Sequence, residues 1–263
     1  MKTSPQRIAA IALVASLALA ACGDDDEADE PIEEPAADTT AADEPVEEPA
    51  ELAGTLVGAG ASSQSAAMQG WQAGFQALYP DVTVEYDAIG SGGGRGTFLE
   101  GGSNFAGSDA FLDDEEYAAS LDVCAGGQGA VNLPHYISPI AIAYNLPSLE
   151  GTTLQLSPAT LAGIFANTIT TWNDPAIAAD NPGVDLPDTT VNPVHRSDES
   201  GTTENFTDYL SAVAPEVWTF GAIEAWDADG PGGGEGADGT SGVVAATGAG
   251  EGSIGYADAS QIG

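Results

Sequence analysis

The fold is decided by a stretch near the start of the folded part of the chain, Leu56-Val57-Gly58-Ala59-Gly60-Ala61-Ser62-Ser63. Its apolar beginning is typical of a short strand, and its glycines indicate a tight turn. After the turn, Met68, Trp71, Phe75 and Leu78 recur at helical spacing. The stretch therefore predicts a strand, a glycine turn and a helix in that order.

The same unit recurs further along the chain. Val82, Val84 and Tyr86 alternate as a second strand, which leads into Ile89-Gly90-Ser91-Gly92-Gly93-Gly94, where another helix is expected to begin. Phe105-Ala106-Gly107-Ser108-Asp109 has the composition of a third buried strand that ends in polar residues. We expect a short helix over 113–119 and a strand within 137–144.

The second half of the chain continues the alternation. Ser157 and Pro158 are a helix N-cap and first position. Val191 to Val194 form a strand that runs into His195-Arg196-Ser197-Asp198-Glu199-Ser200-Gly201-Thr202-Thr203, and a helix follows. Residues 230–242 are interpreted as a glycine-rich loop and 254–256 as a last strand. About 210 residues from Leu52 onward therefore favour an α/β fold in one large or two small domains.

The N-terminus has the features of an export signal. Lys2 and Arg7 precede an apolar run over 8–20, which is too short to span a bilayer as a stable helix. The run ends in Leu19-Ala20-Ala21-Cys22, the pattern at which bacterial lipoproteins are cleaved and acylated. We therefore interpret 1–21 as a lipoprotein signal peptide and Cys22 as the lipid attachment site. The alternative is an ordinary secreted protein with a chance cysteine.

Residues 22–51 are predicted to be an acidic disordered tether. They consist almost wholly of Asp, Glu, Pro, Ala and Thr, which cannot bury enough apolar surface to fold. Roughly 28 residues of random coil reach about 30 Å, and charge repulsion extends them. If Cys22 is acylated, Cys124 is left without an intramolecular disulfide partner.

The charge balance excludes one class of partner. Without the signal, Arg95 and Arg196 are the only basic residues, against 41 acidic ones. A nucleic-acid partner is therefore not expected. An acidic surface also repels anions at long range, so an anion site in this chain must act through local hydrogen bonds.

Several loops place Ser, Thr or Gly at the start of a helix, where free N–H groups and the helix dipole favour an anion. The strongest is Arg196 to Thr202, which supplies a guanidinium, hydroxyls and amides just before a helix. For any one of these glycine loops taken alone, a tight turn is the favoured explanation. Gly58-Ala59-Gly60 is also half of a dinucleotide fingerprint, but the third glycine and the following acid are missing.

Taken together, the ordered motifs resemble those of the PstS family, the substrate-binding proteins of phosphate ABC transporters. The resemblance covers Leu52 to Tyr256. It rests on seven groups of residues: Gly58-Ala59-Gly60-Ala61-Ser62, Ile89-Gly90-Ser91-Gly92-Gly93-Gly94, Gly107-Ser108-Asp109-Ala110, Trp172-Asn173-Asp174-Pro175-Ala176-Ile177, Asn181-Pro182-Gly183, His195-Arg196-Ser197-Asp198 with Ser200-Gly201-Thr202, and Gly252-Ser253-Ile254-Gly255-Tyr256.

The resemblance implies a set of phosphate-binding residues: Ser62, the amide of Ser63, Ser91, Asp109, Arg196, Ser200, Gly201 and Thr202, with Asp198 orienting Arg196. Asp109 can only accept a hydrogen bond, which suits a ligand that carries its own proton, as HPO₄²⁻ and H₂PO₄⁻ do. Sulfate lacks that proton, so a sulfate oxygen at Asp109 leaves two acceptors facing each other, at a cost of several kcal/mol. Arsenate shares phosphate's geometry and protonation and is not distinguished.

Three positions need separate interpretation. Glu199 stands where the family usually has glycine, so it either weakens binding or faces solvent. Arg95 follows a glycine loop and is either a solvent-exposed partner for one of the many acids or a ligand contact. His195 belongs to a strand end and is interpreted as packing.

The resemblance implies a two-lobed, periplasmic-binding-protein-like (type II) α/β fold with a hinge and a ligand cleft between the lobes. Lobe 1 is expected over 52–135 and lobe 2 over 136–255, with crossovers near Pro134 to Tyr144 and near Tyr256. Residues 256–263 are expected to begin a return to lobe 1 whose remainder is missing, so the chain is interpreted as C-terminally truncated. Phosphate is expected to close the lobes about the hinge.

The function implied is an extracytoplasmic lipoprotein, not an enzyme, that captures inorganic phosphate and delivers it to the membrane subunits of an ABC importer. It is expected on the outer face of the bacterial cell membrane, as a monomer, without a cofactor or metal. The alternatives are a secreted phosphatase and a phosphate sensor or adhesin on the same fold. A phosphatase needs a base beside Ser62 or Ser200, and the sequence places none there.

Overall fold

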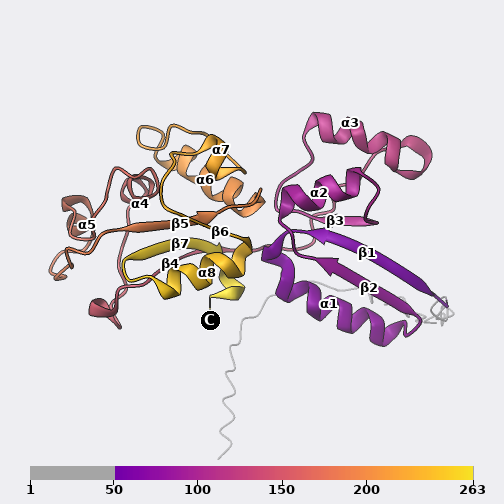
Figure 1. Ribbon diagram of the computed structural model, residues 1–263, viewed down its shortest axis with the longest axis horizontal. Coiled ribbons are helices and arrows are strands. Elements are labelled where there is room, and N and C mark those ends of the chain that lie inside the picture. The colour runs from indigo at the N-terminus through magenta and orange to yellow at the C-terminus, as the bar shows by residue number, and fades with distance from the viewer. Residues whose placement is uncertain (1–50, 263) are drawn as a thin grey trace, which may run out of the picture. The chain divides into compact units, whose positions relative to one another are not determined.

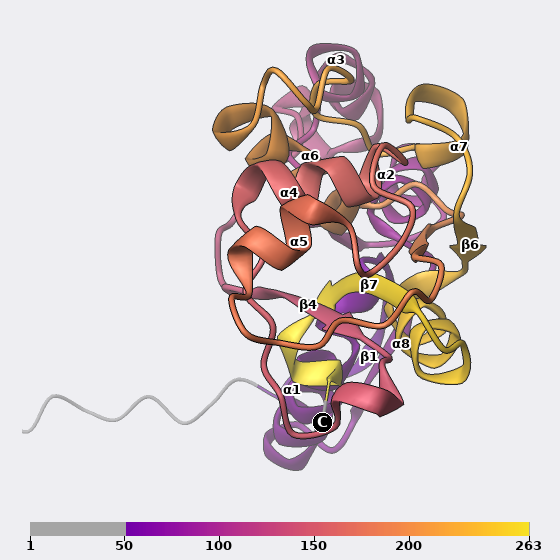
Figure 2. The same cartoon turned by 90° about the vertical axis from the view of Figure 1, so that its left-hand side faces the viewer.

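The computed structural model describes residues 51–262, which build two lobes, each a β-sheet flanked by helices (Figures 1 and 2). The predicted signal peptide at 1–21, the lipid attachment site Cys22 and nearly all of the tether at 22–51 lie outside the described residues. Within 51–262, no helix has the length and apolar character needed to cross a membrane.

Lobe 1 contains a parallel three-stranded sheet in the order β2-β1-β3. Its strands are β1 (Gly54–Gly60), β2 (Val82–Asp87) and β3 (Phe105–Gly107). Its helices are α1 (Ser65–Leu78), α2 (Ser91–Leu99) and α3 (Asp114–Val123), with 3₁₀ turns at Ser62–Gln64 and Ala125–Gly127. Helix α1 packs against β2, whereas α2 packs against β1 and β3 (Figure 1).

Lobe 2 contains a mixed four-stranded sheet in the order β4-β7-β5-β6, in which only β4 runs antiparallel to its neighbour. The strands are β4 (Ile140–Tyr144), β5 (Asn192–Arg196), β6 (Glu235–Ala237) and β7 (Ser253–Asp258). The helices are α4 (Pro158–Phe165), α5 (Pro175–Asp180), α6 (Gly201–Val213), α7 (Trp226–Asp229) and α8 (Gly239–Ala249), with 3₁₀ turns at Pro147–Leu149 and Ala259–Gln261.

The hydrophobic core of the described residues lies in lobe 2. Its buried side chains come from Leu146 to Tyr256, and the ring of Phe165 makes edge contacts with Phe206, Trp226 and Tyr256. Helices α4 and α6 contribute buried side chains to this core, while α8 packs against β5 and β7. This packing fixes the strand end from which the Arg196 loop departs.

Lobe 1 is less completely packed in the described residues. Helix α1 forms where the apolar spacing predicts it, but Met68 is its one buried residue, and Trp71 and Leu78 are 40% and 75% exposed. The periodicity therefore predicted the helix correctly, although it did not predict how much of the apolar face would be covered.

Helix starts follow from local hydrogen bonding. Asp113 and Glu116 form a reciprocal capping box at α3. Ser157 accepts from the amide of Thr160 at the start of α4, as its position before Pro158 predicts. Ser200 caps α6 in the same way.

The alternation of strands and helices confirms the predicted α/β class, and one local interpretation was wrong. Residues 230–242 are not one loop, because β6 and the first turn of α8 lie within them. Glycines there have little propensity for either element, so only tertiary pairing with β5 selects the strand. The boundary expected after residue 255 falls inside β7, which pairs with β4 as far as Asp258.

Candidate anion-binding site

Residues of the candidate site follow the carboxyl ends of five parallel strands. The ends of β1, β2 and β3 lead to Ser62, Ser91 and Asp109 in lobe 1. The ends of β5 and β6 lead to Arg196 and to Gly239 in lobe 2. Loops at the carboxyl ends of parallel strands are where open α/β sheets bind ligands.

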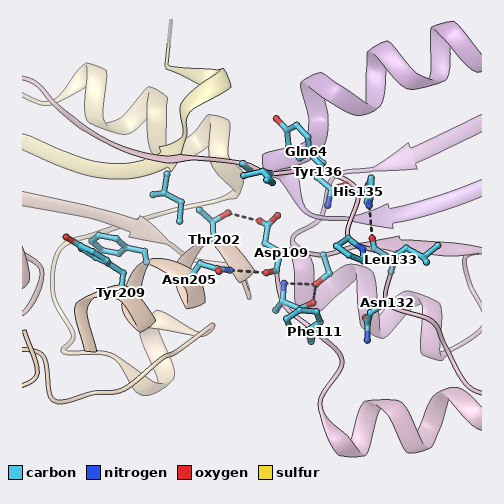
Figure 3. A pocket seen from close by; sticks show the side chains of 18 of the residues that line it. Gln64, Asp109, Phe111, Asn132, Leu133, His135, Tyr136, Thr202, Asn205 and Tyr209 are labelled. Atoms are coloured by element: carbon cyan, nitrogen blue, oxygen red, sulfur yellow. Dashed lines mark hydrogen bonds between the residues drawn. The ribbon is translucent and has the colours of Figure 1, made fainter. Parts of the chain in front are cut away.

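Asp109 of lobe 1 makes hydrogen bonds to lobe 2 (Figure 3). Ser63 Oγ lies 2.8 and 2.7 Å from the two carboxylate oxygens, and Thr202 Oγ1 of lobe 2 donates to Oδ2 at 2.9 Å. Ser91 Oγ accepts from the Asp109 amide at 3.2 Å. The resemblance implied a role for the amide of Ser63 alone, so its hydroxyl contact is new.

Arg196 is held by Asp198, the residue that the resemblance implies as its orienting partner. The guanidinium is 2% exposed, and its Nε donates to Asp198 Oδ1 at 2.6 Å while Nη2 donates to Oδ2. The Gly239 amide donates to the same Oδ1 at 3.2 Å. Asp198 therefore fixes the direction of Arg196 and ties it to the start of α8.

Behind Arg196, a buried tyrosine supports the loop. Burial raises the pKa of Tyr256 to about 12, so its hydroxyl stays protonated. That hydroxyl accepts from the Arg196 amide at 3.3 Å and lies 2.7 Å from Thr203 Oγ1. The pKa of Tyr86 in lobe 1 is raised by burial and by the charge of Asp109, and its hydroxyl donates to the Ala61 carbonyl.

Ser62 connects lobe 1 to the start of α8. Its Oγ accepts from the Thr240 amide at 3.0 Å and lies 3.0 Å from Thr240 Oγ1. Gln261 Nε2 donates to the Ser62 carbonyl at 2.8 Å. Sequence reasoning missed Gly239 and Thr240 because it treated their glycine-rich surroundings as a loop. The threonine that follows the glycine run was the feature that could have indicated a helix start there.

Three helix N-termini converge on the cluster: α2 begins at Ser91, α6 at Gly201 and α8 at Gly239. Free amides and the helix dipole make each of them attractive to an anion. A side chain at Gly201 would come within 2.9 Å of the Asp109 backbone, so glycine is required for this close approach.

The net charge near the site is negative, although its geometry suits an anion. Arg196 is offset by Asp198, and Asp109 and Glu199 add two further acids. Glu199 has an exposed side chain that lies over Gly92, and its carbonyl accepts from the Gly92 amide at 3.4 Å. Hydroxyls and amides must therefore supply most of the attraction for a ligand.

The structure contradicts one interpretation of Arg95 and confirms the interpretation of His195. Arg95 is buried, 7% exposed, and is paired with Glu116 and Glu224, so the interpretation as a solvent-exposed side chain was wrong. His195 is buried and stacks on Trp226 with 4.9 Å between ring centroids, which confirms its interpretation as packing.

A cavity of about 750 Å³ opens beside Asp109 and Thr202. Figure 3 shows Asp109, Thr202 and Asn205 on its polar side, with Phe111, Tyr209 and the 131–137 segment supplying most of its apolar lining. The other predicted site residues are not part of this lining. Among residues 51–262, no group of three or more His, Cys, Asp and Glu side chains could hold a metal ion.

Comparison with known proteins assigns the class of protein to which this chain belongs. Residues 45–262 match the family model described as the PBP superfamily domain. The chain therefore belongs to the PBP superfamily, and the predicted two-lobed periplasmic-binding-protein fold is confirmed.

Two curated relatives match about three quarters of this chain. Over 202 residues the chain is 42% identical to phosphate-binding protein PstS 3 of Mycobacterium leprae, covering 77% of this chain and 53% of that protein. It is 38% identical over 201 residues to PstS of Xylella fastidiosa, covering 76% and 52%. The chain thus spans about half the length of the curated relatives it matches.

A solved structure shares the fold. The phosphate-binding protein of Stenotrophomonas maltophilia aligns with a TM-score of 0.61 at 24% identity, over 78% of this chain and 60% of that one. At this identity the likeness concerns the fold alone.

Proposed function

We propose that this chain captures inorganic phosphate outside the cytoplasm and passes it to the membrane subunits of an ABC importer. The observation that carries the proposal is the position of Asp109. An acceptor-only carboxylate lies among hydroxyl donors from both lobes, and Asp109 contacts residues at the N-termini of α2 and α6. The relatives' names, phosphate-binding protein PstS, support the same ligand.

In the proposed complex, Ser62, Ser63, Ser91, Ser200, Gly201 and Thr202 donate to phosphate oxygens through hydroxyls and amides, and Arg196 supplies the one cation, oriented by Asp198. Asp109 accepts the proton that phosphate carries. Because residues of both lobes contact the same ion, binding favours the closed arrangement of the lobes. That arrangement is what an importer would recognise.

The receptor is favoured over a phosphatase. The relatives carry the names of binding proteins. The Ser62 hydroxyl is bonded to Thr240, and the Ser200 hydroxyl accepts from the Thr203 amide, so neither lies against a general base. A sensor or adhesin on the same fold would bind phosphate equally well and differs only in its protein partner.

Calorimetric titration of the purified chain with phosphate, and separately with sulfate, tests the ligand. We expect one phosphate per chain at micromolar affinity, about −8 kcal/mol, and no heat from sulfate. Equal binding of both anions, or binding of neither by a folded sample, contradicts the proposal.

We further propose that Cys22 is acylated and holds the protein, as a monomer, on the outer face of the cell membrane. Several acyl chains contribute about 0.8 kcal/mol for each buried methylene. In cells, the parent chain is expected in the membrane fraction and the Cys22→Ser variant in the soluble fraction. Equal partition of the two contradicts the anchor.

A further inference from the structure

Arg95 is the hub of a buried ion-pair network that the phosphate site does not use directly. Its Nε donates to the two oxygens of Glu116 at 2.9 and 3.0 Å. Its Nη1 and Nη2 donate to the two oxygens of Glu224 at 3.0 and 2.7 Å. The guanidinium thus forms a fork-shaped pair with Glu224, the strongest geometry available to an arginine, and shares its Nε–H between the two oxygens of Glu116.

The two partners belong to different lobes. Glu116 lies on α3 of lobe 1, the lobe that also carries Arg95 on α2. Glu224 lies in lobe 2, in the segment between α6 and α7. One edge of the guanidinium therefore binds within its own lobe, and the other edge crosses to the second lobe.

Both ends of the network lie one contact from proposed phosphate ligands. Arg95 lies one turn after Ser91 on α2, and its Nη1 donates to Ser108 Oγ at 3.2 Å, immediately before Asp109. The Glu224 carbonyl accepts from the Ser200 amide at 3.2 Å, at the N-cap of α6. The pair thus links the loops that both lobes contribute to the anion site.

The energetics make this link sensitive to separation of the lobes. Burial of Arg95 opposes its charge, but hydrogen bonds to Glu224 and Glu116 outweigh it and raise the arginine pKa. Both carboxylates have side chains 22% exposed. Loss of the guanidinium would leave two partly buried acids near Glu204, whose own pKa is raised by burial and by Glu224.

We propose that Arg95 is a positioning residue that clamps the two lobes together behind the anion site through Glu224. The clamp sets how often the binding-competent, closed arrangement is populated, and the apparent affinity for an anion scales with that population. This inference rests on the proposed phosphate function, but closure of the lobes is measurable without phosphate.

Two glutamine variants form a matched pair for the test. Glu224→Gln removes the charge across the lobes, whereas Glu116→Gln removes the charge within lobe 1 and keeps the capping box, which accepts glutamine. Arg95→Gln completes a double-mutant cycle with Glu224→Gln. Should Arg95→Gln fail to fold, the two glutamate variants alone decide the question.

The first measurement is the distance between spin labels in the absence of phosphate. The labels are placed on cysteines introduced at Ala118 of lobe 1 and Ala212 of lobe 2, both exposed, with Cys22 and Cys124 replaced by serine. Glu224→Gln and Arg95→Gln are expected to shift the distribution toward longer distances, whereas Glu116→Gln is expected to leave it unchanged.

The second measurement is phosphate affinity by calorimetry. Glu224→Gln is expected to weaken phosphate binding about 10- to 100-fold, whereas Glu116→Gln is expected to weaken it by less than about threefold. The double variant Arg95→Gln, Glu224→Gln is expected to bind phosphate as tightly as whichever of its two single variants binds less tightly. Unchanged distances in Glu224→Gln overturn the clamp. Changed distances with unchanged affinity overturn the positioning role. If the parent binds no phosphate, the proposed function fails while the label distances still test the clamp.

Discussion

Replacing Asp109 by asparagine is expected to exchange selectivity for promiscuity. The carboxylate accepts from Ser63 and Thr202 at 2.7 to 2.9 Å, and in the proposed complex it also accepts the proton of phosphate. Asparagine keeps one acceptor oxygen, removes the charge and adds an N–H donor. The shape of the site is therefore preserved while its acceptor-only character is lost.

The size of the effect follows from these contacts. A hydrogen bond to a charged group contributes about 1.5–3 kcal/mol, so phosphate affinity is expected to fall about 10- to 150-fold. Sulfate no longer faces an acceptor-only carboxylate, and removal of even about 3 kcal/mol of the penalty for two opposed acceptors raises its affinity about 150-fold. The ratio of phosphate to sulfate affinity is therefore expected to fall by at least about 1,000-fold.

Calorimetric titrations of both anions into the parent, Asp109→Asn and Asp122→Asn measure this ratio. Asp122 is an exposed acid on α3, so its replacement changes the net charge equally without touching the site. All titrations share one salt concentration because exposed charges are screened. If the ratio in Asp109→Asn stays within about threefold of the parent, or Asp122→Asn shifts it equally, the role of Asp109 is refuted.

Three other changes test the charge of the site and the stability of lobe 2. Glu199→Gln removes an acid that lies against the start of α2, so phosphate should bind about two- to fivefold more tightly by calorimetry; weaker binding contradicts this. Phe165→Ala empties a fully buried ring position in lobe 2 and should lower the free energy of unfolding in urea by about 3–5 kcal/mol; a loss below about 1 kcal/mol would show that this core is not packed as described. Burial, then Glu224, raises the pKa of Glu204, so its folded state binds a proton more tightly than the unfolded chain does. The ionised carboxylate therefore costs stability near pH 7.5 and ceases to do so below the unfolded pKa of about 4.3. Glu204→Gln should stabilise the fold at about pH 7.5 and show no such gain at about pH 4, measured by urea unfolding; an equal gain at both pH values rules out ionisation as the cause. The charged groups facing Glu204 are Glu224, Arg95, Asp208 and Glu116.

The sequence predicted those parts of the fold that local chemistry decides. Glycine turns between an apolar strand and a periodic helix predicted the start of α1, and Ser157 before Pro158 predicted the start of α4. The α8 region was missed because glycine and small residues carry no periodic apolar signal. Its helix is selected by packing on β5 and β7, which a single sequence does not display.

Contacts within the site are likewise of two kinds, local ones that the sequence indicates and long-range ones that it does not. Arg196 and Asp198 lie in one motif, so the resemblance could imply their contact, which is present. The contacts of Thr240 with Ser62 and of Glu224 with Arg95 span far larger sequence separations, and no local rule links them. In so acidic a chain, tertiary packing decides which two acids, Glu116 and Glu224, pair with Arg95.

The central claim is that loops of both lobes bind one phosphate ion. A crystal structure of the chain grown with phosphate tests it most directly. The account predicts a single ion in contact with Ser91, Arg196 and Thr202, with one phosphate oxygen about 2.5–2.7 Å from an Asp109 carboxylate oxygen. A phosphate bound by one lobe only, or bound away from Asp109, would contradict it.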